Sequence, residues 1–220
     1  MRRAPSKPVL LATVVVALLP RIVSAADPGL TSPPRQERAG AQSPARLFRL
    51  GAQEIGIAAG YGFAIPIADT SDDELRDVQY IYFAPRWGIG ISDPMGEDAW
   101  YRGNIELVAE GAFLLNVEPK DGFAGGITAL LRYNFLPEGV FIPFVEAGVG
   151  ILSLDFDLKN RSDGLNFTVQ AGFGFHYFVS DRTAFTGEWR YHHISNADIE
   201  QPNFGINSSL FLIGVTIFLQ

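Results

Sequence analysis

The sequence predicts an all-β protein, an eight-stranded antiparallel transmembrane β-barrel, and three observations support this class. Apolar side chains alternate with small or polar ones through most of the chain after residue 50, which is the period of a β-strand. The more apolar face of these segments carries almost no charge and is aromatic near its ends, as expected of strands that contact lipid. The chain starts with a stretch typical of exported proteins, as a barrel of the bacterial outer membrane requires, and it has no cysteine.

The first 47 residues are expected to lie outside the barrel. Basic residues precede an apolar run over 9–19, and small residues follow at 23–25; these are the three parts of a secretory signal peptide. The run is too short to span a bilayer as a helix. We therefore expect a signal peptide over residues 1–25, a flexible segment rich in Pro, Ser and Ala over 26–47, and the barrel domain over 48–220.

The charge and composition of the exported chain exclude several kinds of partner. Four of the 17 basic residues precede the expected cleavage site, which leaves 13 against 24 acidic residues and a formal charge of −11. A chain this acidic is not expected to bind nucleic acid. The absence of cysteine excludes both a disulfide scaffold and a thiolate metal site.

Eight segments carry the alternating pattern. In the first of them Ile55, Ile57 and Tyr61 lie on one face, while Glu54 and Gly56 lie on the other. The same division recurs along the chain, so the expected strands are residues 51–63, 80–91, 104–115, 123–133, 141–151, 167–177, 183–195 and 208–220.

The less apolar face decides between a barrel in a membrane and a soluble β-sandwich. A sandwich exposes its charged face to water. Here that face carries mostly Gly, Ala and Thr, with isolated charges of both signs at Glu54, Arg86, Glu106, Glu110, Arg132, Glu146, Glu188 and Arg190. Such a face suits the narrow interior of an eight-stranded barrel, which paired side chains fill without leaving an open pore.

The links between the strands predict the orientation of the barrel. The links at 93–98, 136–139 and 180–182 are short, whereas those at 66–78, 117–122, 155–164 and 196–206 are mostly longer. Short turns face the periplasm and long loops face outward in such barrels. The strand over 183–195 is therefore expected to run outward and to end at the level of the outer leaflet.

The polar stretch "YHHIS" at the end of that strand is divided between the two faces. His193 and Ser195 share the lipid-facing side, about 7 Å apart between Cα atoms, whereas His192 points inward, where we expect an interior hydrogen-bonding group. Asn207 has the parity of the lipid-facing residues of the last strand and is expected beside them. Serine, histidine and an orienting side chain are together a nucleophile, a general base and a group that fixes the imidazole tautomer.

The motif "HISNA" followed by "QPNFGIN" closely resembles the lipid A 3-O-deacylase family of the outer membrane, eight-stranded barrels that remove the 3-linked acyl chain of lipid A. The resemblance is clearest over residues 189–207. It implies that Ser195 is the nucleophile and His193 the base, with no metal and no cofactor. It also implies a substrate, lipid A of lipopolysaccharide, among the lipids of the outer leaflet. The position of Asn207 is typically a glutamate in that family, so this chain departs from the pattern there.

An asparagine at position 207 can fulfil part of the role of that glutamate. Its side-chain oxygen can accept from the imidazole Nδ1–H, but it cannot stabilise imidazolium as a carboxylate does. The order His-x-Ser-Asn also resembles outer-membrane phospholipase A, whose twelve-stranded barrel is larger than this chain can supply. Asp198 and Glu200 are alternative acids, and both lie in the loop after the strand.

Each of four further residues near the motif has a functional and a structural interpretation. Asn196 and Asn203 either match family positions that suit donors to an oxyanion or only shape the loop. Trp189 and Tyr191 either line a groove for an acyl chain or belong to the aromatic girdle of a membrane interface.

A polar cluster that faces lipid costs free energy. A substrate with an acyl ester in the same leaflet explains why the chain keeps such a cluster. The sequence therefore favours an outer-membrane serine esterase that removes the 3-O-linked acyl chain of lipid A. The alternatives are a phospholipase A-type activity and a non-catalytic small outer-membrane barrel.

Overall fold

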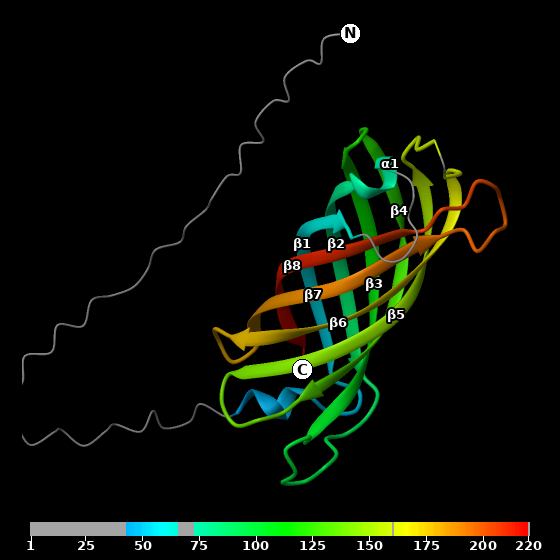
Figure 1. Cartoon of the computed structure of the whole chain (residues 1–220). Helices are drawn as coiled ribbons and strands as arrows, with labels where there is room; N and C mark the ends of the chain where they lie inside the picture. Colours follow the sequence, from blue (N-terminus) through cyan, green and yellow to red (C-terminus); the bar gives the residue numbers. More distant parts are fainter. Residues whose placement is uncertain (1–42, 66–72, 160, 220) are drawn as a thin grey trace, which may run out of the picture. The chain divides into compact units, whose positions relative to one another are not determined.

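The computed structural model describes residues 43–65, 73–159 and 161–219, and over these it is a closed antiparallel barrel (Figure 1). Each strand pairs with its neighbours in sequence, and the barrel closes where the first strand pairs with the last. The strands are β1 Gln53–Ala64, β2 Gln79–Gly90, β3 Gly103–Glu118, β4 Gly122–Phe135, β5 Phe141–Asp155, β6 Gly164–Phe178, β7 Thr183–Ser195 and β8 Ile206–Leu219. The predicted fold class is confirmed. The expected signal peptide and most of the expected flexible segment lie outside the described residues.

Alternating side chains face opposite sides of the barrel wall, as the sequence predicts. On β1, Ile57 is 58% exposed whereas Glu54 is 2% exposed and Ala58 is 3% exposed. The same alternation of buried and exposed positions runs along the other strands. The exposed side is the predicted lipid-facing side, because its side chains are large and apolar.

The inward charges form one ion-pair network in the middle of the barrel. Arg190 donates to Glu110 at 2.9 Å, to Glu146 at 2.6 Å and to Glu188 at 2.9 Å. Arg86 donates to Glu110 at 2.7 Å, and it also pairs with Glu188. These side chains are buried, so each charge is compensated by several partners, which an ion taken out of water requires.

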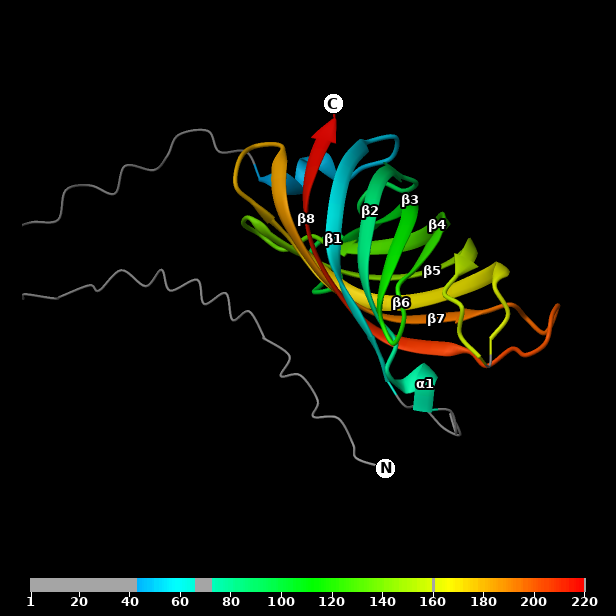
Figure 2. The same ribbon diagram turned by 90° about the horizontal axis from the view of Figure 1, so that it is seen from above.

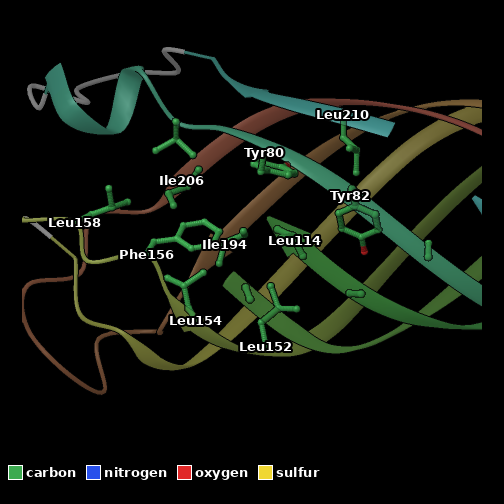
Figure 3. Packing of buried hydrophobic residues seen from close by; sticks show 14 of the residues in the cluster. Tyr80, Tyr82, Leu114, Leu152, Leu154, Phe156, Leu158, Ile194, Ile206 and Leu210 are labelled. Atoms are coloured by element: carbon green, nitrogen blue, oxygen red, sulfur yellow. The ribbon is translucent and has the colours of Figure 1, made fainter. Parts of the chain in front are cut away.

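Two apolar clusters lie on either side of this network. The first lies near the ends of the strands that the links 65–78, 119–121, 156–163 and 196–205 join, and we call this the loop end. Its buried members include Tyr80, Tyr82, Leu114, Leu152, Phe156, Ile194 and Leu210 (Figure 3). The second cluster lies at the opposite or turn end, where β1 begins and β8 ends; it includes Phe48, Leu136, Ile142, Phe178 and Phe218. Side chains thus pack the barrel interior from one end to the other.

A short 3₁₀ turn, η1 Pro44–Leu47, precedes the barrel at its turn end. Ala45, Leu47 and Phe48 are buried, and the Phe48 ring lies 5.0 Å from that of Phe218, centroid to centroid. The predicted border between residues 47 and 48 therefore falls inside a segment that packs against the barrel.

Two connections differ from the predicted length by three residues or more. The β2–β3 connection, predicted as the six residues 93–98, runs over 91–102 because β2 ends at Gly90 and Met95 pairs with Gly103 in an isolated bridge. The β3–β4 connection is only 119–121, because β3 continues to Glu118, which pairs with Gln79 of β2. The prediction that short links gather at one end of the barrel is therefore wrong for these two links.

Helices contribute little to the described chain. The β1–β2 loop carries a single turn, α1 Asp73–Arg76. No helix within the described ranges has the length and hydropathy needed to cross a membrane.

The ion-pair network predicts a large loss of stability when its central cation is removed. Arg190→Met leaves the carboxylates of Glu110 and Glu146 short of compensation in the barrel interior, so the free energy of unfolding should fall by about 3–5 kcal/mol. Urea titration of the refolded protein in micelles, followed by tryptophan fluorescence, measures this. Arg49→Met, at an exposed position, is the control and should change it by less than about 0.5 kcal/mol. Equal stability of the two variants would contradict this account of the network.

Candidate active site

The candidate site lies on the outer wall of the barrel, where β7 and β8 run side by side (Figure 2). His193 and Asn207 are direct partners in the register of these strands. Both side chains are half-buried, and the Nδ1 atom of His193 lies 2.8 Å from Oδ1 of Asn207. An amide oxygen can only accept, so Nδ1 carries the hydrogen, and in the neutral ring Nε2 keeps a free lone pair. The adjacency predicted from parity is confirmed.

Ser195 is the last residue of β7 and shares the outward face with His193. It is half-buried, and its partner in β6 is Phe167. Within the described part of the chain, the Ser195 hydroxyl makes no hydrogen bond. Catalytic hydrogen bonds are often formed only when substrate is present, and a free hydroxyl at this position can approach an acyl carbon from the lipid side.

His192 lies on the inner side of the wall, as predicted. It is fully buried, its Nδ1 atom is 2.8 Å from the hydroxyl oxygen of Tyr80, and its ring packs edge-on against Tyr82. The two consecutive histidines therefore lie on opposite sides of the barrel wall, and only His193 is on the side of Ser195.

Gly205, which has no side chain, leaves space for the His193 ring. A Cβ atom at position 205 would lie 2.7 Å from Cε1 of His193, which is far inside van der Waals contact. The glycine before β8 thus leaves space for the imidazole in the position from which its Nδ1 atom reaches Asn207.

The β7–β8 loop, residues 196–205, is held by its own side chains. Asn203 Oδ1 accepts from the backbone N–H of Asn196 at 3.0 Å, and Asn203 Nδ2 donates to Asp198 at 3.0 Å. Asn196 Nδ2 donates to the carbonyl of Glu200 at 2.7 Å. Ala197 and Asp198 both have left-handed φ angles, 54° and 61°, a conformation that such bonds must support. In the described structure these asparagines shape the loop, and their oxyanion role stays a prediction.

The alternative acids lie in the same loop and bond elsewhere. Asp198 is exposed and accepts from Gln201 and Asn203, and Glu200 is exposed. In the described structure the acceptor at His193 Nδ1 is therefore Asn207.

Arg161, in the β5–β6 loop (residues 156–163), joins the two strands of the site, and no sequence pattern predicted its role. It is buried and donates to the carbonyl oxygens of Ile194 at 3.1 Å and Phe204 at 2.8 Å, and it also bonds Asn166 Oδ1. Ile194 immediately precedes Ser195, and Phe204 immediately precedes Gly205. One guanidinium therefore fixes the backbone on both sides of the cluster.

A second set of bonds reinforces this contact between loops. Ser162 donates its backbone N–H to the carbonyl of Pro202 at 2.8 Å, and its hydroxyl accepts from Asn196 Nδ2 at 2.7 Å. Burial lowers the pKa of Arg161 to about 10, so the guanidinium still carries its charge at neutral pH.

Trp189 and Tyr191 donate to polar partners on β8. The indole N–H of Trp189 donates to Ser209 at 2.7 Å, and the hydroxyl of Tyr191 donates to Asn207 Oδ1 at 2.5 Å. The Trp189 ring also packs on Phe173, with centroids 5.3 Å apart. Tyr191 is thus part of the polar cluster itself, through the same oxygen that His193 contacts.

An apolar groove of about 810 Å³ runs over the outer wall from β2 to β6. Its lining includes Pro85, Trp87, Ala109, Ala129, Ile151 and Phe167. Phe167 and Val169, at its β6 side, are the register partners of Ser195 and His193. The apolar groove therefore reaches the strand next to the site.

The closed barrel, its apolar outer wall and its paired inner charges define an integral outer-membrane β-barrel protein. A family model described as lipid A 3-O-deacylase (PagL) matches residues 75–216, which include β2 to β7 and most of β8. The chain belongs to this family of outer-membrane hydrolases. No match was found among curated proteins.

Several solved structures are similar to the chain. The crystal structure of the outer membrane enzyme PagL is 20% identical, with a TM-score of 0.46, over 73% of this chain and 97% of that one. Neisserial surface protein A (NspA) is 16% identical, with a TM-score of 0.49, over 76% of this chain and 96% of that one. The N-terminal β-barrel domain of Pseudomonas aeruginosa OprF is 14% identical, with a TM-score of 0.47, over 81% of this chain and 100% of that one.

Removing the Arg161 guanidinium should loosen the β7–β8 loop without unfolding the barrel. Arg161→Gln leaves the buried carbonyl oxygen of Ile194 and the partly buried one of Phe204 unpaired, at about 1–3 kcal/mol for the buried group. Hydrogen exchange of the Asn196 and Ser162 amides should become about tenfold faster or more, because 1.4 kcal/mol is a factor of ten.

The control for this experiment is Arg182→Gln, an exposed arginine in the turn between β6 and β7, and it should leave both amides unchanged. Amides of the β4–β5 ladder should exchange alike in all three proteins. Unchanged exchange at Asn196 in Arg161→Gln would show that the guanidinium does not hold the loop.

Proposed function

We propose that the protein is a serine esterase that removes the 3-O-linked acyl chain of lipid A. The observation that carries the proposal is the hydrogen bond of His193 to Asn207 on the lipid-facing wall, with Ser195 next along the same face. Membership of the lipid A 3-O-deacylase family supplies the substrate class.

In the proposed reaction Ser195 attacks the acyl carbonyl while Nε2 of His193 takes its proton. Nδ1–H of His193 donates to Asn207 throughout, which keeps Nε2 available as the base. The tetrahedral intermediate then breaks its bond to the sugar oxygen, which leaves with the proton from His193. Water, deprotonated by the same Nε2 atom, attacks the acyl-enzyme, and the fatty acid and the free serine are released. Asn196 and Asn203 are the proposed donors to the oxyanion, and in this role they exchange their bonds within the loops for bonds to the substrate.

The position of the site suits a lipid substrate. The cluster lies at the loop end of the barrel, where β7 ends, and this end faces outward in the proposed orientation. The apolar groove beside β7 can hold hydrocarbon chains, because apolar surface prefers apolar contacts over water. A lipid in the outer leaflet can therefore bring an ester bond to Ser195 while its chains stay against the barrel wall.

The first prediction concerns the nucleophile. Ser195→Ala should abolish release of the 3-hydroxyacyl chain, with a rate loss on the order of 10⁴-fold or more, because no other group forms the acyl-enzyme. Mass spectrometry of lipid A from cells that produce each protein measures this. Ser153→Ala removes a serine from another outward position near the loop end and should behave as the wild type.

Other outcomes of the same measurement separate the competing functions. Lysophospholipid formed by the wild type, with intact lipid A, would replace the proposal by a phospholipase A-type activity. No lipid change with any of the proteins would indicate a non-catalytic barrel.

A second prediction concerns the third residue of the cluster. Asn207→Asp keeps the length of the side chain and supplies a carboxylate, whose charge-assisted bonds are about twice as strong as neutral ones. The deacylation rate should rise about tenfold, because the anion stabilises the imidazolium that forms in the transition state. Asn207→Leu is the matched variant without an acceptor and should lose most activity. A rate for Asn207→Asp far below the wild type would show that the site is built around an amide.

A further inference from the structure

The Asn207 side-chain oxygen receives two donors on the outer wall. Tyr191 O–H reaches it at 2.5 Å, and His193 Nδ1 lies at 2.8 Å. Tyr191 and His193 are successive outward residues of β7, and their partners on β8 are Ser209 and Asn207. Tyr191 therefore reaches diagonally across the strand pair to a side chain that faces His193.

An amide at this position poses a problem that a carboxylate does not. With its oxygen toward His193, the amide holds the hydrogen on Nδ1 and leaves Nε2 able to accept the serine proton. With its NH₂ group toward His193, Nδ1 must accept, the hydrogen moves to Nε2, and the imidazole is no longer a base toward Ser195. A carboxylate has acceptors at both ends, so its rotation has no such consequence.

We propose that Tyr191 is the positioning residue that holds the Asn207 amide with its oxygen toward His193. A phenol is a good donor but a poor acceptor, because its oxygen lone pair is delocalised into the ring. The observed orientation gives the phenol hydrogen a strong acceptor. In the rotated orientation, Tyr191 would face an NH₂ group, and its own hydrogen would lose the amide oxygen as its acceptor, which is costly on an apolar wall.

This inference rests on the proposed function for its purpose, and it extends that function to a residue outside the family motif. Tyr191 acts through Asn207 and then His193, so it need not touch the substrate. By orienting the amide, Tyr191 compensates in part for Asn207 standing where the family that the motif resembles typically has a glutamate.

The kinetic test compares Tyr191→Phe in two backgrounds. With Asn207 present, the variant should lower kcat by about 3- to 10-fold, the equivalent of one neutral hydrogen bond, and leave KM within about twofold because the ring is kept. With Asn207→Asp, the same change should alter kcat by less than about twofold, because either carboxylate oxygen serves. Equal losses in the two backgrounds would overturn the positioning role.

Tyr61→Phe is the matched control. Tyr61 also faces outward, from β1, and donates its hydroxyl to a side-chain amide oxygen, that of Gln79. The variant removes the same atom from the same kind of bond away from the site, and its kcat should equal that of the wild type.

A spectroscopic test reads the tautomer directly and does not depend on turnover. In ¹⁵N-histidine-labelled protein in micelles, with neutral rings and with His193→Gln used for assignment, wild-type His193 should carry its hydrogen on Nδ1. Tyr191→Phe should shift a large share of the signal to the Nε2–H form, and Tyr191→Phe combined with Asn207→Asp should restore Nδ1–H. An unchanged tautomer in Tyr191→Phe would overturn the inference. The shift without any deacylation by the wild type would confirm the positioning by Tyr191 and refute the proposed function.

Discussion

The structure depends on one constraint, which is that a strand in a membrane must pair its backbone on both edges and can direct each side chain only inward or outward. Closure of β1 on β8 meets the first condition. The second condition directs alternate side chains along each strand to the inside and the outside of the barrel. Charged side chains therefore lie in the interior network, and apolar ones face lipid. The neighbours His192 and His193 consequently lie in entirely different surroundings.

Within this constraint a polar side chain on the outer wall has a cost, and the cluster at the end of β7 reduces it by internal bonding. Asn207 accepts from both Tyr191 and His193, and Ser209 accepts from Trp189. Loops supply the rest of the support, because Arg161 bonds the carbonyl oxygens of Ile194 and Phe204, the residues that immediately precede Ser195 and Gly205. The candidate site is therefore held by the paired strands β7 and β8 and by the contact between the β5–β6 and β7–β8 loops.

The parity of the strands could be predicted from the sequence because it is a local, period-two property. Parity correctly predicted that His192 lies inside the barrel and that His193 lies beside Asn207. Connection lengths were less predictable, since the end of β2 at Gly90 and the continuation of β3 to Glu118 depend on pairing with neighbouring strands. The bonds of Arg161 and the contact of Gly205 with His193 were not predicted for the same reason, because they join segments that only the folded register brings together.

The proposed enzymatic function depends on Ser195 being a nucleophile that His193 activates on the lipid-facing wall. The most direct measurement is covalent labelling by a long-chain alkylsulfonyl fluoride, followed by peptide mass spectrometry of the refolded protein. We expect a stoichiometric adduct on Ser195 in the wild type and a much slower one in His193→Gln. Labelling at another residue, or equal labelling rates in the two proteins, would contradict it.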